Sequence, residues 1–258
     1  NGKNLEVKIQ ERLDEVNLIV PLYKMVTLQP LGGEGSDPKQ LIVDGSRVFI
    51  ADPGVQRVLR YGLDEVSGLI PETSGGVLAE RGQTLSDGQL VGDIVDIVWA
   101  AAGGQRVSSN LLILDSNRNV IEVDPAIGLT PLAVGGRDQW VTPRIMESYN
   151  GNLYLLDSGS GRILRYLATE DGYADAPDDY LADGAKLDFS HVVDMAIDGN
   201  VWILYSDGTV QTFFQGTQQA FVLETPPDGP ITSPQAIYTG SAAGAAESVY
   251  IVDSANSR

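Results

Sequence analysis

Arg47-Val48-Phe49-Ile50-Ala51-Asp52 is a short apolar strand that ends in an acidic residue, and the same pattern returns four more times along the chain. The other copies are Asn110–Asp115, Asn152–Asp157, Asn200–Tyr205 and Ser248–Asp253. The last residues of successive copies lie 63, 42, 48 and 48 positions apart. A period of about 40 to 50 residues built from short strands is typical of radially repeated β-structure.

The neighbours of each copy complete a four-stranded unit. A leading strand such as Gln40–Val43 precedes an Asp-Gly or Asn-Gly pair, which favours a tight hairpin. Third strands follow each of the first four copies, at Val58–Tyr61, Val120–Val123, Ile163–Tyr166 and Val210–Phe213. A weaker fourth strand is expected at Leu129–Val134. The sequence therefore predicts an all-β fold, a β-propeller of four-stranded blades with five or six blades.

The two ends of the chain differ from this pattern. Leu5, Ile9, Leu13 and Val16 share one face of a helix, so residues 1–22 are predicted to form an N-terminal helix and linker and residues 23–258 the propeller. Tyr23–Leu31 resembles a fourth strand without inner strands of its own. It either completes the fifth blade, or residues after 258 complete that blade and add a sixth. We expect the chain to be a piece of a longer protein, with the propeller truncated at its C-terminus.

Composition limits the partners. The chain has 17 Lys and Arg against 35 Asp and Glu, a net charge of −18, which repels phosphate backbones and anionic lipid headgroups. We therefore expect no nucleic-acid partner and no membrane contact within this chain, and no apolar run approaches the ~20 residues that span a bilayer. The charge either only aids solubility or marks an acidic docking face. The chain has no Cys, so thiolate chemistry is excluded.

Three copies resemble the core of an NHL-type propeller repeat, at Val48–Arg57, Leu153–Arg162 and Val249–Arg258. The family pattern also has a Pro before the first strand, which Pro38, Pro143 and Pro234 match. The second copy departs from it in its shorter turn after Asp115, and the fourth in having Tyr205 for Asp. The resemblance implies a fold that hosts binding platforms and several enzyme classes. A helix followed by a propeller also resembles the outer regions of some membrane-anchored bacterial proteins, which implies an extracytoplasmic or cell-surface location.

Catalytic motifs are not apparent. The repeated Asp is expected to accept backbone N–H groups of the turn that follows it, and the Arg five residues later can pair with it or with a neighbouring blade. A metal site with several imidazole or thiolate ligands is excluded, because His191 is the single His. An oxygen-only Ca²⁺ site stays possible, and the acidic stretch 170–184 is its best local candidate, although a solvated loop is the favoured interpretation. No cofactor is expected otherwise.

The starts of the leading strands are the candidate binding site, because they should meet at the mouth of the central channel. The residues concerned are Lys39, Gln40, Asp93, Arg144, His191, Asp194 and Gln235. Aromatic residues of the second strands are expected in the core between blades, at Phe49, Tyr154, Trp202 and Tyr250. The sequence favours a non-enzymatic binding or scaffolding module for a protein or small-molecule ligand. The alternative is a Ca²⁺-dependent propeller hydrolase of the lactonase kind.

Overall fold

The computed structural model describes residues 33–64, 66, 70, 75–124, 127–170, 172–226, 229–240 and 248–256, together with Leu5, Val7–Ile9 and Arg12. The described residues near the N-terminus are helical and exposed, as the short N-terminal helix requires. The rest of that helix and the segment Tyr23–Leu31 lie outside the described residues. Within the described part, no helix is long and apolar enough to cross a membrane.

The chain folds into four-stranded antiparallel sheets, each built from consecutive strands. Blade 1 contains β1 (Gln40–Asp44), β2 (Arg47–Asp52), β3 (Arg57–Gly62) and β4 (Gly76–Glu80). Blade 2 contains β5 (Ile94–Ala100), β6 (Asn110–Asp115), β7 (Val120–Asp124) and β8 (Gly128–Pro131). Blade 3 contains β10 (Pro143–Tyr149), β11 (Asn152–Asp157), β12 (Arg162–Tyr166) and β14 (Asp178–Asp179). Blade 4 contains β15 (Val192–Ile197), β16 (Asn200–Tyr205), β17 (Val210–Phe214) and β18 (Thr217–Gln219).

Smaller elements complete the described part. A fifth inner hairpin pairs β19 (Pro234–Gly240) with β20 (Ser248–Asp253). A short parallel pair joins β9 (Ala133–Val134) to β13 (Gly172–Tyr173), which links the outside of blade 2 to blade 3. Two turns of 3₁₀-helix lie at Arg137–Gln139 and Ser254–Asn256. All five predicted inner hairpins are therefore present.

The hairpin turns follow from their residues. Asn150 and Gly151 join β10 to β11 with φ angles of 50° and 79°. Both angles are positive, as the commonest two-residue hairpin turn requires, and Asn and Gly are the residues that adopt such angles most easily. A Cβ at Gly151 would also lie 1.9 Å from the carbonyl oxygen of Gly103, so this turn accepts no larger residue.

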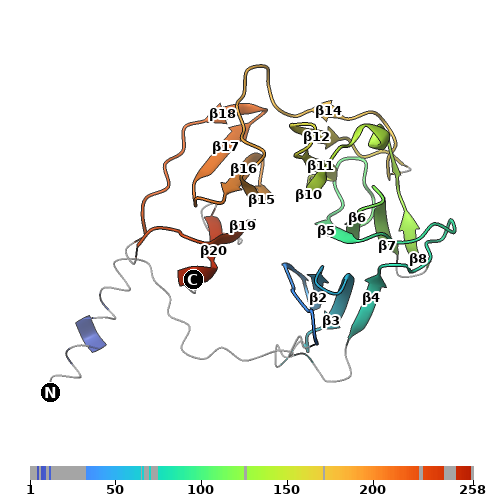
Figure 1. Ribbon diagram of the computed structural model, residues 1–258, viewed down its shortest axis with the longest axis horizontal. Coiled ribbons are helices and arrows are strands. Elements are labelled where there is room, and N and C mark those ends of the chain that lie inside the picture. Colours follow the sequence, from blue (N-terminus) through green and yellow to red (C-terminus); the bar gives the residue numbers. More distant parts are fainter. Residues whose placement is uncertain are drawn as a thin grey trace.

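The sheets stand around a common centre with their first strands innermost, in chain order (Figure 1). The core consists of separate clusters between neighbouring sheets. One cluster packs Leu112 and Leu114 of blade 2 on Met146 and Leu155 of blade 3, and others fill the three remaining interfaces. Second strands are buried on both sides because each lies between two sheets, which is why they read as continuous apolar runs. The fold is thus the predicted β-propeller of four-stranded blades.

The structure corrects three expectations, which concern the acidic stretch, the partner of Arg162 and the burial of Tyr250. Part of the acidic stretch 170–184 is not a loop, because Asp178 and Asp179 form β14 and pair with arginines of β12. Arg162 consequently contacts Asp179 of its own blade, 2.9 Å away, rather than Asp157 or a neighbouring blade. Among the second-strand aromatics, Phe49 and Tyr154 are buried as expected, whereas Tyr250 is exposed. The face of the β19–β20 hairpin that carries Tyr250 has no described sheet against it.

Candidate functional site

The candidate residues lie at one end of the ring. First and second strands are antiparallel, so each first strand begins where the second strand ends. Pro143 pairs with Asp157 in blade 3, and Val192 pairs with Tyr205 in blade 4. This end of the ring therefore carries both the starts of the first strands and the repeated aspartates.

The repeated aspartates are fully buried hydrogen-bond acceptors, at Asp52, Asp115, Asp157 and Asp253. Each accepts backbone N–H groups from the loop that precedes the first strand of its own sheet. The donors are Asp37, Gly92, Val141, Thr142 and Ser233, at 2.7 to 2.9 Å. The structural role expected from the sequence is present, but the following turn supplies only some of the donors. The aspartates tie the loop before the first strand to the end of the second strand.

The surroundings of Asp52 and Asp157 favour the charged form of each carboxylate. Burial raises the pKa of Asp157, but hydrogen bonds from the N–H groups of Val141 and Thr142 outweigh burial and hold the pKa below its usual value. Burial likewise raises the pKa of Asp52, and the Asp37 N–H, the Ser36 hydroxyl and Arg57 more than offset it. Arg57 lies 3.1 Å from Asp52, as the sequence spacing suggested. A charged carboxylate held in this way is an acceptor and not an acid or a base for catalysis.

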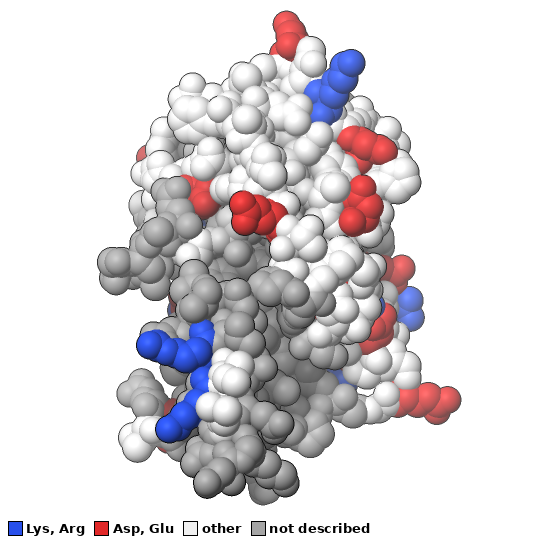
Figure 2. All heavy atoms as spheres, turned by 90° about the vertical axis from the view of Figure 1, so that its left-hand side faces the viewer, with Lys and Arg blue, Asp and Glu red and all other residues white. Residues whose placement is uncertain are grey.

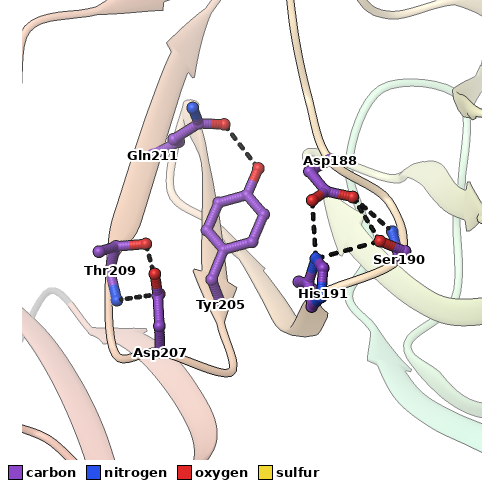
Figure 3. Close-up of polar contacts among 7 residues, drawn as sticks. All are labelled: Asp188, Ser190, His191, Tyr205, Asp207, Thr209 and Gln211. Carbon is purple, nitrogen blue, oxygen red and sulfur yellow. Dashed lines mark hydrogen bonds and ion pairs between the residues drawn. The ribbon is translucent and has the colours of Figure 1, made fainter.

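In blade 4 a different residue accepts the hydrogen bonds of the loop before the first strand. Tyr205 stands where the other sheets have Asp, so the loop before β15 loses its acceptor. Asp188, which lies in that loop, replaces it: its Oδ1 accepts the Ser190 N–H at 3.1 Å and the Ser190 hydroxyl at 2.6 Å. Ser190 is the counterpart of Val141 in blade 3. The cluster of Asp188, Ser190 and His191 therefore arises from a local substitution in the repeat (Figure 3).

The geometry of this cluster differs from that of a catalytic triad. Nδ1 of His191 lies 2.7 Å from Asp188 Oδ2 and 3.1 Å from Ser190 Oγ, so both contacts use the same ring nitrogen. In a triad the base contacts the acid and the nucleophile through opposite nitrogens. Ser190 donates its proton to Asp188, and hydrogen bonds from Ser190 and then His191 lower the pKa of Asp188 to about 2. The cluster therefore caps a loop and does not activate a nucleophile.

Tyr205 opens a hollow beside this cluster. Its hydroxyl donates to Oε1 of Gln211 at 2.6 Å, and burial raises the pKa of Tyr205 to about 12, so the hydroxyl stays protonated at neutral pH (Figure 3). The hollow has a volume of about 410 Å³ and lies between the loops 188–191 and 206–209. A neighbouring hollow of about 770 Å³ shares Asp188 and Gln211 with it. Together they form a polar depression on blade 4.

The depression is acidic. Its lining includes Asp179, Asp183, Asp188 and Asp207, against Lys186. Acidic side chains are also spread over the described upper part of the side of the ring that carries blade 4 and the β19–β20 hairpin (Figure 2). Side chains of one charge that line a concave surface create an electrostatic potential there, which raises the local concentration of oppositely charged ligands. This surface is suited to positively charged groups.

A second set of polar groups links adjacent blades through their first strands. Oε1 of Gln40 accepts the N–H of Ile97 at 3.0 Å, and a carboxylate oxygen of Asp194 accepts the N–H of Ile237 at 2.9 Å. Asp96 accepts the N–H of Met146 in the same way. The acceptors occupy equivalent positions in the register of their sheets. Each ties its own blade to the first strand of the next.

These carboxylates lie near the centre of the ring and resist ionisation. Burial raises the pKa of Asp96 well above its usual value, and burial raises the pKa of Asp194 to about 6. Burial also raises the pKa of Glu147 well above its usual value, and the charges of Asp194 and Asp96 add to the effect. The three carboxyl groups therefore interact across three adjacent blades.

The predicted site residues separate into groups. Gln40, Asp194 and Arg144 connect neighbouring blades, the last by donating to the carbonyl of Val192 at 3.3 Å. Lys39 and Asp93 instead form exposed ion pairs with Asp37 and Arg81.

Gln235, near the start of β19, donates to the carbonyls of the two residues before it, Ser233 and Pro234. Of the seven residues, only His191 lines the depression on blade 4. Most of the seven residues thus make structural contacts in this structure, and their role in binding stays a prediction.

Other polar residues of the site were missed. Asp188, Asp207 and Gln211 sit in loops and an outer strand, where a polar residue is ordinary. Asp96 carried a signal, because it interrupts the apolar run of its first strand, Ile94–Ala100. Glu147 follows two apolar residues of its strand and precedes Ser148, so its signal was weaker. An acidic residue in a buried strand requires a hydrogen-bond partner. Within the described ranges, no three His, Asp or Glu side chains come together as a metal site.

Comparison with protein-family models found no match, and comparison with curated proteins found none either. Solved structures do match. A chain in the crystal structure of a nidogen/laminin complex superposes with a TM-score of 0.54 at 15% identity, over 85% of this chain and 73% of that one. A putative gluconolactonase matches with a TM-score of 0.50 at 17% identity, over 81% of this chain and 68% of that one. At this identity the likeness shows the fold alone, so the protein is a β-propeller.

Proposed function

We propose that this propeller is a non-enzymatic binding or scaffolding module that recognises a protein or small-molecule ligand. We further propose that it is of NHL type and forms an extracytoplasmic sensor or interaction domain of a larger bacterial protein. The repeats Val48–Arg57 and Leu153–Arg162 support the NHL assignment. A propeller in a nidogen/laminin complex offers a precedent for a binding role on this fold.

One observation carries the proposal: the buried carboxylates are occupied by backbone N–H groups. Asp157 takes two from the loop before β10, and Asp194 takes one from the next first strand and one from Met195. Removing such an acceptor leaves buried donors without partners, which costs stability. The fold therefore requires these carboxylates as hydrogen-bond acceptors. Acceptors that are used in this way are poorly placed to serve as a catalytic acid or base.

The surface proposed for recognition is the depression on blade 4. It combines His191, Tyr205 and Gln211 with the carboxylates of Asp188 and Asp207. Blade 4 departs from the repeat here, because Tyr205 replaces Asp. A departure that changes a concave surface while the sheet stays intact supports a role in binding.

The hydrolase alternative lacks a specific observation in its favour. A lactonase-like Ca²⁺ site needs several oxygen ligands that converge on one point. Asp96, Glu147 and Asp194 influence one another's pKa, but they do not form a metal-binding group in the described residues. We therefore do not propose it.

Site-specific photocrosslinking tests the binding proposal. A photoreactive residue replaces His191 in cells that produce the natural protein, and a matched control replaces Val77, an exposed residue of β4. The proposal expects an adduct of one discrete mass from position 191 and none from position 77. Excess unlabelled chain should compete for it, whereas the chain with His191→Ala and Asp207→Ala should not.

A parallel assay addresses catalysis. The chain is incubated with a panel of lactones and esters, with and without Ca²⁺. Turnover that Asp194→Ala abolishes would contradict the proposal, and so would equal adducts from both crosslinking positions.

A further inference from the structure

The polar depression on blade 4 also has an apolar floor. Its larger hollow, of about 770 Å³, is lined mainly by the loop between β14 and β15. In that loop Leu181, Ala185, Leu187 and Phe189 are partly buried and pack on the core between blades 3 and 4. Exposed charged residues lie between these apolar ones, at Asp183, Lys186 and Asp188. The hollow therefore combines apolar surface at its base with charge at its rim.

The charge of the rim is mainly negative. Four carboxylates line the two hollows against one ammonium group, at Asp179, Asp183, Asp188, Asp207 and Lys186. Asp179 is already paired with an arginine of β12 at 2.9 Å. Hydrogen bonds, first from Ser190, lower the pKa of Asp188 to about 2, and hydrogen bonds from Thr209 lower the pKa of Asp207. Asp188 and Asp207 therefore both carry a charge at neutral pH.

The loop that forms the larger hollow is fixed to blade 4. The N–H of Ala182 donates to the carbonyl of Gly216 at 3.0 Å, and the hydroxyl of Tyr180 donates to the carbonyl of Phe213 at 3.2 Å. A Cβ at Gly216 would lie 2.2 Å from the carbonyl oxygen of Tyr180, so the loop lies directly on this turn. Asp188 caps the other end of the loop. A surface that is shaped before its ligand arrives loses less entropy on binding.

An apolar floor below a charged rim fits a particular ligand chemistry. Arginine and lysine side chains combine an aliphatic stem with a cationic head, and the stem covers apolar surface while the head stays at a polar edge. A small inorganic cation would contact the carboxylates and leave the floor uncovered. The floor thus favours a basic side chain over a simple ion.

The depression is larger than one side chain requires. Its two hollows, of about 770 and 410 Å³, share Asp188 and Gln211 and are therefore continuous. Each lies in the range of about 300–1,000 Å³ that holds a drug-sized ligand. Figure 3 shows Asp188 and Asp207 on opposite sides of Tyr205. Two basic residues of one segment can therefore each meet a carboxylate.

We propose that the depression binds a basic segment of a partner protein, an inference that rests on the binding role proposed above. The stem of one arginine or lysine lies on Leu187 and Phe189, and its cationic head meets Asp183 and Asp188. A second basic residue of the segment reaches Asp207. The net charge of −18 draws such a partner toward the protein and speeds its association.

Calorimetric titration of the 258-residue chain with a capped heptapeptide, in which three lysines alternate with glycines, tests the proposal. Acetylation of the lysines removes the charge and should abolish binding. Replacing lysine by diaminobutyrate keeps the charge on a shorter stem. This peptide should bind at least about fivefold more weakly, because each stem loses two methylene groups that the floor covers. Spermidine, which carries as many positive charges as the lysine peptide, should also bind more weakly.

Substitutions in the chain locate the binding surface. Asp183→Asn and Asp207→Asn each remove one charge and keep an acceptor oxygen. Asp87→Asn is the matched control, because Asp87 is exposed in a turn between blades 1 and 2. The first two should each weaken binding of the lysine peptide about two- to fivefold, as the loss of an exposed ion pair does. Screening by salt should limit the effect of the control to less than about 1.5-fold.

Four results would overturn the proposal. Equal binding of the lysine and diaminobutyrate peptides would show that the carboxylates alone attract the ligand. Equal effects of Asp87→Asn and Asp183→Asn would show that binding follows net charge and not this surface. Spermidine that binds as tightly as the lysine peptide would make the ligand a free polyamine. No binding of the lysine peptide, together with a discrete crosslinked adduct from position 191, would contradict this inference and leave the binding role itself intact.

Discussion

Asp157→Ala should destabilise the propeller far more than its location at a strand end suggests. Asp157 is fully buried, and its carboxylate accepts the N–H groups of Val141 at 2.8 Å and Thr142 at 2.7 Å. Weaker contacts reach Gly159 and Ser160 at 3.2 and 3.4 Å. Truncation removes all of these acceptors at once.

The magnitude follows from the two short hydrogen bonds. A buried donor that loses its partner costs about 1–3 kcal/mol. Both donors belong to a partly buried loop that water can reach in part, so the sum should be about 3 kcal/mol. For a domain of this size each kcal/mol lowers Tm by about 2–4 °C, which gives a decrease of roughly 6–12 °C.

Thermal and urea unfolding followed by circular dichroism measure this effect. Asp157→Asn keeps one acceptor oxygen, so it should lower the free energy of unfolding less than Asp157→Ala does. The matched control is Asp207→Ala, because Asp207 is exposed and its carboxylate accepts hydrogen bonds from Thr209 in its own turn. The control should shift stability by about 0.5 kcal/mol or less. An Asp157→Ala protein that melts within about 2 °C of the parent would refute the reasoning.

Further predictions concern pH, calcium and the N-terminal segment. The pKa of Asp157 is lowered in the folded state, so the stability that it provides is present above its unfolded pKa of about 3.8 and is lost as pH falls. The difference in free energy of unfolding between the parent and Asp157→Ala should therefore shrink in urea titrations at lower pH. The pKa of Asp194 is raised to about 6 in the folded state, so this group stabilises the fold most at low pH. The free energy of unfolding of the parent should fall by at most about 3 kcal/mol as pH rises from about 4 to 7, and Asp194→Asn should reduce this dependence on pH. Millimolar Ca²⁺ should leave Tm unchanged within about 1 °C, because a ligand stabilises only a protein that binds it; a rise that grows with Ca²⁺ would revive the hydrolase alternative. Deleting residues 1–31 should lower Tm by more than about 2 °C if residues 23–31 pair in the ring, and a smaller change would make the segment a tail.

Much of the fold could be predicted because the inner strands are buried on both faces. The run from Val48 to Asp52 has no polar residue before its end, and such a run fits only between two sheets. Outer strands have an exposed face, so β14 at Asp178–Asp179 was mistaken for loop. Its arginine partners on β12 are distant in sequence, and propensity alone gave no indication of them.

The candidate site was less predictable because its contacts are long-range. Asp157 reaches back 15 and 16 positions to Thr142 and Val141, and Asp194 reaches forward 43 positions to Ile237. The sequence showed that a carboxylate interrupts a strand, but not which N–H it meets. Tyr250 shows a different limit of the sequence. Its strand has the apolar pattern of a buried second strand, but whether the side chain is buried depends on a neighbouring blade, which the strand's own sequence does not reveal.

Amide hydrogen exchange at three residues tests most directly the claim that the polar groups near the channel serve the architecture. The N–H groups of Ile97, Met146 and Ile237 are the donors of the links between blades. They should exchange only with global unfolding of the parent, and Asp194→Ala should accelerate Ile237 and its neighbour Met195 while Ile97 stays protected. Exchange of all three donors at the rate of an unstructured peptide, or no change at Ile237 in Asp194→Ala, would contradict the account.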